Sequence, residues 1–181
     1  MKKKMGKRSS FKRVPRDFYP TPIEAVEPLI PHLPREFTFT EPCAGDGALC
    51  GHLEHYGGTC MWASDIEPQH EGIHPNDYKE IGYDQMVESE FVITNPPWDR
   101  KILHPLIEHY SILHKKLTWL LFDADWMHTI QARPYIENCE KIVSVGRIKW
   151  FGNMTGKDNC AWYLFTNKYV PLEKPRFYGR M

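Results

Sequence analysis

The chain has 181 residues, 41% of them hydrophobic and 25% charged, as expected of one globular domain large enough to bury a substantial core. No apolar run approaches the ~18 residues that cross a membrane, and no apolar stretch follows the basic N-terminus as it would in a signal peptide. The composition therefore argues against an integral membrane protein and predicts a cytoplasmic protein without a membrane partner.

The formal net charge is zero, but the charges are unevenly distributed. Residues 1–16 hold 8 of the 23 lysines and arginines and no acid, so 15 basic residues remain against 23 acids and residues 17–181 carry −8. A basic arm on an acidic body is typical of a protein with a polyanionic partner, and equally of a solubilising tail. We expect a flexible arm over 1–16 and a single domain over 17–181.

Apolar periodicity and turn residues predict alternating helices and strands along that domain. The expected helices begin near Thr21 or Pro22, run from a Gly-rich turn to Gly57, and cover 100–116 and 127–139. The expected strands cover 36–40, 59–68, 90–94, 117–126, 141–151 and 159–170, with a further short strand near Tyr78. This alternation predicts an α/β protein with a mainly parallel sheet covered on both faces, and the last two strands form an antiparallel hairpin.

The cysteines and histidines do not indicate a metal site. The five cysteines form no Cys-x-x-Cys pair, and the nine histidines show no ligand spacing. Such cysteines are typical of reduced thiols and not of a disulfide framework. We therefore expect no bound metal.

A Gly-rich turn, EPCAGDG (41–47), follows the first expected strand and precedes a helix. Gly45 and Gly47 would let the backbone approach a ligand, and the helix N-terminus presents free N–H groups. The spacing is neither the GxGxxG fingerprint nor a lysine-bearing phosphate loop, and a tight strand-to-helix turn would explain it equally well. Asp65, however, ends the next strand, where an acid hydrogen-bonds ribose hydroxyls in doubly wound sheets. Together these features predict a nucleoside-containing cofactor.

The stretch FVITNPPWDR (91–100) is a buried strand that stops abruptly at an amide. Asn-Pro favours a turn, and prolines cannot continue a central strand, so Asn95 and Trp98 are expected on a stiff loop. One explanation of this stretch is purely structural: a polar turn ends the strand, and Trp98 packs in the core. The alternative is that the amide and the aromatic ring are held at the strand end for a functional role.

Three blocks carry a resemblance to a known family: DFYPTP (17–22), EPCAGDG (41–47) and NPPW (95–98). In this order they resemble the γ-type amino-group S-adenosylmethionine-dependent methyltransferases, most closely the small phage-type DNA N6-adenine methyltransferases. The resemblance covers residues 17 to about 167, including RIKWFG and AWYLF near its end. It implies a Rossmann-like class I methyltransferase fold, a three-layer α/β/α sandwich. The sheet would have seven mostly parallel strands with an antiparallel last strand, and the protein would act in a bacterial or phage-infected cell.

The resemblance also implies roles for individual residues around S-adenosylmethionine. Tyr19, Thr21 and Pro22 would hold its methionyl end. Glu41 would face its ammonium, with Asp65 on the ribose and Ile66 on the adenine. Asp77, in NDY (76–78), would take the adenine amino group, although Asp84 is a competitor. The other residues assigned to the cofactor are Pro42, Cys43, Ala44, Gly45, Gly47 and Tyr78.

The catalytic residues implied are Asn95, Pro96, Pro97 and Trp98. An adenine amino group is a poor nucleophile because its lone pair is delocalised into the ring. If the Asn95 side-chain oxygen and the Pro96 carbonyl accept hydrogen bonds from N6, the lone pair turns toward the sulfonium methyl. Such catalysis depends on positioning and electrostatics. Trp98 offers a face on which an extruded base can stack.

The chain departs from larger family members because nothing in it is long enough to be a separate target-recognition domain. Candidate readers are the basic arm, residues 69–90, DADWMH (123–128) and GNMTGKDN (152–159), with Trp126, Arg133 and Lys157 as possible contacts. DNA is the expected partner. An RNA N6-adenine methyltransferase, a protein glutamine methyltransferase and a catalytically silent nucleic-acid-binding protein stay open, as do the recognition sequence and the oligomeric state.

Overall fold

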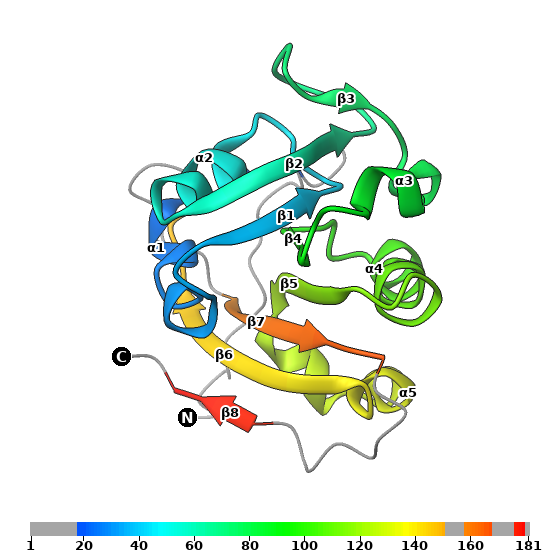
Figure 1. Ribbon diagram of the computed structural model, residues 1–181. Coiled ribbons are helices and arrows are strands. Elements are labelled where there is room, and N and C mark those ends of the chain that lie inside the picture. Colours follow the sequence, from blue (N-terminus) through cyan, green and yellow to red (C-terminus); the bar gives the residue numbers. More distant parts are fainter. Residues whose placement is uncertain (1–17, 151–157, 168–175, 180–181) are drawn as a thin grey trace, which may run out of the picture.

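The computed structural model describes residues 18–150, 158–167 and 176–179. In this part of the chain eight strands form one sheet in the order β3-β2-β1-β4-β5-β7-β6-β8 (Figure 1). The strands are β1 (Phe37–Glu41), β2 (Gly58–Asp65), β3 (His74–Pro75), β4 (Phe91–Thr94), β5 (Leu117–Asp123), β6 (Cys139–Arg147), β7 (Asn159–Phe165) and β8 (Arg176–Tyr178). The predicted α/β fold with a mostly parallel sheet is confirmed.

The antiparallel direction of the hairpin strand agrees with the prediction, but the number of strands does not. Strand β7 runs antiparallel to both β5 and β6, as the closing hairpin required. Seven strands were expected and eight are present among the described residues, because β3 and β8 are short edge strands of two and three residues. Such short strands leave little periodicity in a sequence. Strand β3 pairs with β2 through residues 64 and 65.

Helices cover both faces of the sheet. They are α1 (Ile23–Val26), α2 (Ala48–His55), α3 (Tyr83–Met86), α4 (Arg100–Ile107) and α5 (Arg133–Ile136). One buried apolar cluster joins α1 and α2 to the sheet, and a second joins α3, α4 and α5 to its other face (Figure 1). The protein is thus a three-layer sandwich. No helix within the described ranges is long and apolar enough to cross a membrane.

Three predicted elements are wrong in detail. Near Tyr78 the chain forms a 3₁₀ turn over Tyr78–Glu80 in place of a strand, because the Asp77 and Glu80 side chains cap its first backbone N–H groups. The helix expected over 100–116 stops being α-helical at Ile107 and continues as a π-helix over Glu108–Leu113, shortly after Pro105, which lacks an N–H.

The third is the helix expected over 127–139. It consists of two 3₁₀ turns, Ala124–His128 and Ile130–Ala132, followed by the single-turn helix α5. Trp126, considered above as a nucleic-acid contact, is 1% exposed, and its indole N–H donates to His104 Nε2 at 3.0 Å. It is therefore a core residue. Arg133 is exposed, whereas Lys157 and the 1–16 arm lie outside the described residues.

Candidate functional site

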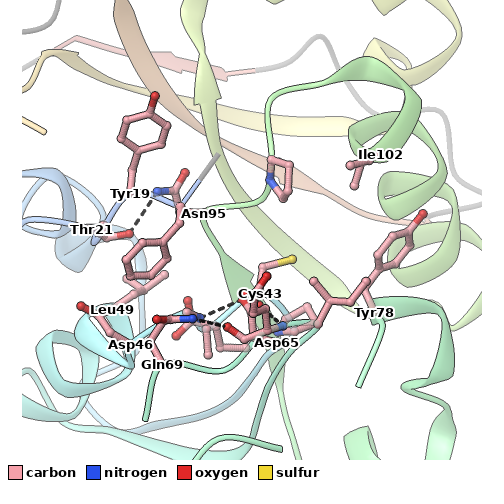
Figure 2. A pocket seen from close by; sticks show the side chains of 18 of the residues that line it. Tyr19, Thr21, Cys43, Asp46, Leu49, Asp65, Gln69, Tyr78, Asn95 and Ile102 are labelled. Carbon is pink, nitrogen blue, oxygen red and sulfur yellow. Dashed lines mark hydrogen bonds between the residues drawn. The ribbon is translucent and has the colours of Figure 1, made fainter. Parts of the chain in front are cut away.

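The candidate site lies where three neighbouring strands end. Strands β2, β1 and β4 are parallel neighbours that end at Asp65, Glu41 and Thr94, so the loops that follow them meet at one edge of the sheet. A cavity of about 390 Å³ opens there, within the range typical of small-molecule sites. Figure 2 shows Tyr19, Thr21 and Asn95 toward one end of it and Asp46, Asp65 and Gln69 toward the other.

Most of the residues singled out in the sequence line this cavity. They are Tyr19, Thr21, Glu41, Pro42, Cys43, Ala44, Gly45, Asp65, Ile66, Asp77, Tyr78, Asn95 and Pro97. Pro22, Gly47, Pro96 and Trp98, though described, are not among the lining residues. Of the two competing carboxylates, Asp77 lines the cavity, while Asp84 is exposed on α3.

Other lining residues were given no role from the sequence, although three of them belong to the quoted blocks: Phe18, Pro20 and Asp46 within those blocks, and Leu49, Glu67, Gln69, Lys79, Lys101 and Ile102 outside them. Gln69 shows why. Its backbone N–H donates to the Gly45 carbonyl at 2.9 Å and its side chain to the Glu67 carbonyl at 2.8 Å, so the loop after β2 folds back onto the Gly-rich turn. This contact joins loops that follow different strands.

The Gly-rich turn and the end of β2 are held together by one carboxylate. Asp65 Oδ2 accepts the Gly45 N–H at 2.9 Å, and Asp65 Oδ1 accepts the Glu67 N–H at 2.8 Å. Each oxygen keeps a lone pair for a further donor. Gly45 has φ 56°, and a Cβ there would lie 2.7 Å from the Phe18 ring, so the turn requires glycine both for its backbone and for its close packing.

Glu41 is a buried carboxyl at the end of β1. Phe37, Phe39 and Glu41 stand at every second position of β1. The Glu41 side chain therefore points to the same face as the two rings, toward α2. It is 1% exposed and accepts the Cys50 S–H at 2.9 Å. Burial raises its pKa well above the ordinary value of 4.5, while the hydrogen bond from Cys50 acts in the opposite direction. A cationic ligand beside Glu41 would favour the carboxylate.

The Asn95 amide is oriented by two neighbours. Its Nδ2 donates to Thr21 Oγ1 at 3.1 Å (Figure 2), and the Trp98 indole N–H approaches its Oδ1 at 3.4 Å. One N–H of the nitrogen is thus bound to Thr21, whereas the oxygen has, among the described residues, one long hydrogen bond, from Trp98, and retains acceptor capacity. Pro96, the next residue, is buried.

An aromatic cluster that the sequence analysis did not assign lies beside this amide. The Trp150 ring packs edge-to-face on Trp98, with centroids 6.0 Å apart, and on Tyr19, with centroids 6.1 Å apart. Trp150 follows the end of β6, which runs parallel to β5 because both are antiparallel to β7. Only the tertiary structure brings it to the same edge of the sheet.

No protein-family model and no curated protein matches the chain. Solved structures resemble it closely in fold. A class I S-adenosylmethionine-dependent methyltransferase of Listeria monocytogenes, itself assigned provisionally, has TM-score 0.58 at 11% identity, covering 94% of this chain and 68% of its own. An RNA methyltransferase of Pyrococcus horikoshii, also provisional, has TM-score 0.55 at 16% identity, covering 88% and 92%. A dimethyladenosine transferase of Plasmodium falciparum has TM-score 0.51 at 13% identity, covering 83% and 63%. The fold is that of the class I S-adenosylmethionine-dependent methyltransferases.

Proposed function

We propose that the protein is an S-adenosylmethionine-dependent methyltransferase that acts on adenine N6 in DNA. The observation that supports the proposal is the Asn95 amide, which lines the cavity, is held by Thr21 through its nitrogen and has an oxygen with remaining acceptor capacity. A primary amide oxygen followed by a rigid Pro-Pro backbone suits an amino group in a planar base.

The cavity suits the cofactor that this fold binds. Five carboxylates line it against two lysines, and S-adenosylmethionine carries both an ammonium and a sulfonium. In the proposal, buried Glu41 faces the ammonium, the glycine turn packs against the methionyl chain, and the free lone pairs of Asp65 accept from the ribose hydroxyls. Asp77 and Tyr78, which also line the cavity, would contact the adenine. The bound cofactor supplies an electrophilic methyl group.

The residues of the chain then prepare the nucleophile. Asn95 Oδ1 and the Pro96 carbonyl accept hydrogen bonds from N6 and turn its lone pair out of the ring plane. Thr21 keeps the amide from rotating, since rotation would bring a donor to N6 in place of an acceptor. The catalytic contribution is the positioning of polar groups in a partly buried site.

A nucleic-acid base as substrate is supported by the aromatic rings around Asn95. Tyr19, Trp98 and Trp150 form one edge-to-face series beside the amide, and flat rings can hold an extruded base by stacking. One solved structure of similar fold is a dimethyladenosine transferase, named for a methylated adenosine. The basic arm of residues 1–16 favours a nucleic acid over a protein as substrate, and DNA is chosen over RNA on the family resemblance.

The test is mass spectrometry of nucleosides from DNA and RNA incubated with the protein and isotope-labelled S-adenosylmethionine. The proposal expects labelled N6-methyladenine in DNA. Label in RNA alone would move the target to RNA, and label on protein would indicate a glutamine side chain. Binding of cofactor without transfer to any of these would contradict the enzymatic assignment.

Glu41 predicts a measurable pH dependence. Because its pKa is raised in the folded state, the folded protein holds a proton that the unfolded chain releases near pH 4.5, and stability falls as pH rises toward the raised pKa. We expect the melting temperature to decline over this interval without cofactor and to decline less with S-adenosylmethionine, whose ammonium would favour the carboxylate. Glu41→Gln should remove the dependence. Identical pH profiles for wild type and Glu41→Gln would contradict this role.

Trp98 is expected to affect both folding and catalysis. It is half-buried and packs against both apolar clusters, and its N–H approaches Asn95 Oδ1. Trp98→Ala should therefore lower the free energy of unfolding by about 1–3 kcal/mol, less than the ~3–5 kcal/mol for a fully buried tryptophan, and should also reduce turnover per folded molecule. Trp98→Phe should restore most of the stability. Denaturant unfolding and single-turnover methylation measure the two effects separately.

A further inference from the structure

Two thiols lie close together beside β1 and are not among the residues that line the cavity. Cys50 is on α2 and Cys60 on the neighbouring strand β2, and their sulfur atoms are 3.5 Å apart. Cys50 Sγ is also the donor to Glu41 Oε2, at 2.9 Å. All five cysteines of the chain are free thiols. The pair is therefore connected by one side-chain contact to the buried carboxyl that we place at the cofactor ammonium.

The two thiols differ in environment. Cys50 is 9% exposed, whereas Cys60 is only partly buried and is the more accessible to a small oxidant. The single S–H of Cys50 can serve either Glu41 or the Cys60 sulfur, but not both. When it turns to Cys60 it stabilises the thiolate there, which lowers the pKa of Cys60 although partial burial opposes this. Cys60 is thus the nucleophilic member of the pair.

We propose that Cys50 and Cys60 form an oxidisable thiol pair, and that their closure to a disulfide weakens the binding of S-adenosylmethionine. The oxidant is a peroxide. The Cys60 thiolate attacks one peroxide oxygen and becomes a sulfenic acid while water leaves. Cys50 then attacks the Cys60 sulfur and displaces a second water, so two thiols and one hydrogen peroxide give one disulfide and two waters.

The coupling to the cofactor follows from the hydrogen bond to Glu41, and it rests on the proposed role of Glu41 at the ammonium. A disulfide has no S–H, so closure removes the donor that favours the Glu41 carboxylate. Glu41 then holds its proton more tightly, and the neutral carboxyl attracts the cofactor ammonium less strongly than the carboxylate does. Losing a hydrogen bond to a charged group should weaken cofactor affinity about tenfold at neutral pH. Closure also brings the sulfurs to about 2.05 Å, which requires a small adjustment between α2 and β2.

The experiment compares the full-length protein before and after treatment with hydrogen peroxide, followed by removal of the oxidant. Intact-mass spectrometry should show a loss of about two hydrogens. Cleavage after Glu54 separates the two cysteines in sequence, so their peptides should stay joined only in the oxidised sample, with fragmentation placing the link at Cys50 and not at Cys43. Calorimetry should show S-adenosylmethionine affinity about tenfold lower, restored by dithiothreitol.

Cys60→Ala is the matched control, with Cys60→Ser as a second variant should the first be unstable. Both retain Glu41, its Cys50 donor and the cavity thiol Cys43. Reduced, they should bind the cofactor like wild type, and peroxide should leave their affinity unchanged. A peroxide effect that persists in the variants would assign it to a residue other than Cys60 and overturn the proposal, as would a disulfide that forms without changing affinity, or no disulfide at all. If the reduced wild-type protein binds no S-adenosylmethionine, the proposed function fails instead.

Discussion

Replacement of Asn95 by alanine is expected to leave S-adenosylmethionine binding intact and to reduce turnover about a hundredfold. The substitution removes the amide oxygen that accepts from N6, and loss of one positioned contact made in the transition state costs on the order of 3 kcal/mol. The apolar core is not disturbed, because Asn95 lies on the loop after β4 and its side-chain hydrogen bonds are to Thr21 and Trp98. Single-turnover methylation of an adenine-containing duplex and cofactor calorimetry separate the two effects.

Two further variants make this test specific. Thr21→Val keeps the side-chain shape but removes the acceptor for Asn95 Nδ2, so the amide can rotate; we expect a smaller loss of turnover, about tenfold. Asn167→Ala is the control, since that amide donates to the Ile112 carbonyl away from the cavity lining and should not affect turnover. Wild-type rates for Asn95→Ala would refute the positioning mechanism.

Replacement of Asp65 by alanine is expected to weaken S-adenosylmethionine binding by ~10–100-fold, since charge-assisted hydrogen bonds contribute about 1.5–3 kcal/mol. The structure adds a second cause. Asp65 accepts the backbone N–H groups of Gly45 and Glu67, so the substitution also releases the glycine turn from the end of β2. Asp65→Asn keeps one acceptor oxygen and should lose less affinity. Calorimetry on each variant measures the change.

Asp84→Ala provides the matched control for this prediction. Asp84 was a competing candidate in the sequence, but it is exposed on α3 and does not line the cavity. Its removal should leave cofactor affinity unchanged. Unchanged affinity for Asp65→Ala, or a large loss for Asp84→Ala, would place the cofactor elsewhere.

Local chemistry was enough to predict where the strands of the site end. The turns at 41–47 and 95–98 are marked by glycine and proline, whose backbone restrictions act within a few residues and are therefore readable from sequence. Since parallel strands end at a common edge, the same reading placed Glu41, Asp65 and Asn95 near one another. The cavity lining agrees with that placement.

Helix continuity and exposure could not be read in the same way. The apolar stripe over 100–116 indicated one helix, yet the α-helical pattern ends soon after Pro105. Trp126 was a possible nucleic-acid contact in the sequence, yet the rings of Phe122, Tyr163 and Phe165 pack around it in the core. The first difference follows from Pro105, which lacks an N–H. The second follows from tertiary packing, because burial depends on neighbours that are distant in sequence.

The sequence by itself thus determined the order of the elements, the mainly parallel sheet and the loops of the candidate site, because periodicity and turn chemistry act over short distances. The tertiary structure alone decided which side chains share a surface. It brought Trp150 to Trp98, chose Asp77 over Asp84 at the cavity, and set Cys50 between Glu41 and Cys60. These are contacts between different elements, fixed by how helices and strands pack, and no spacing along the chain encodes them.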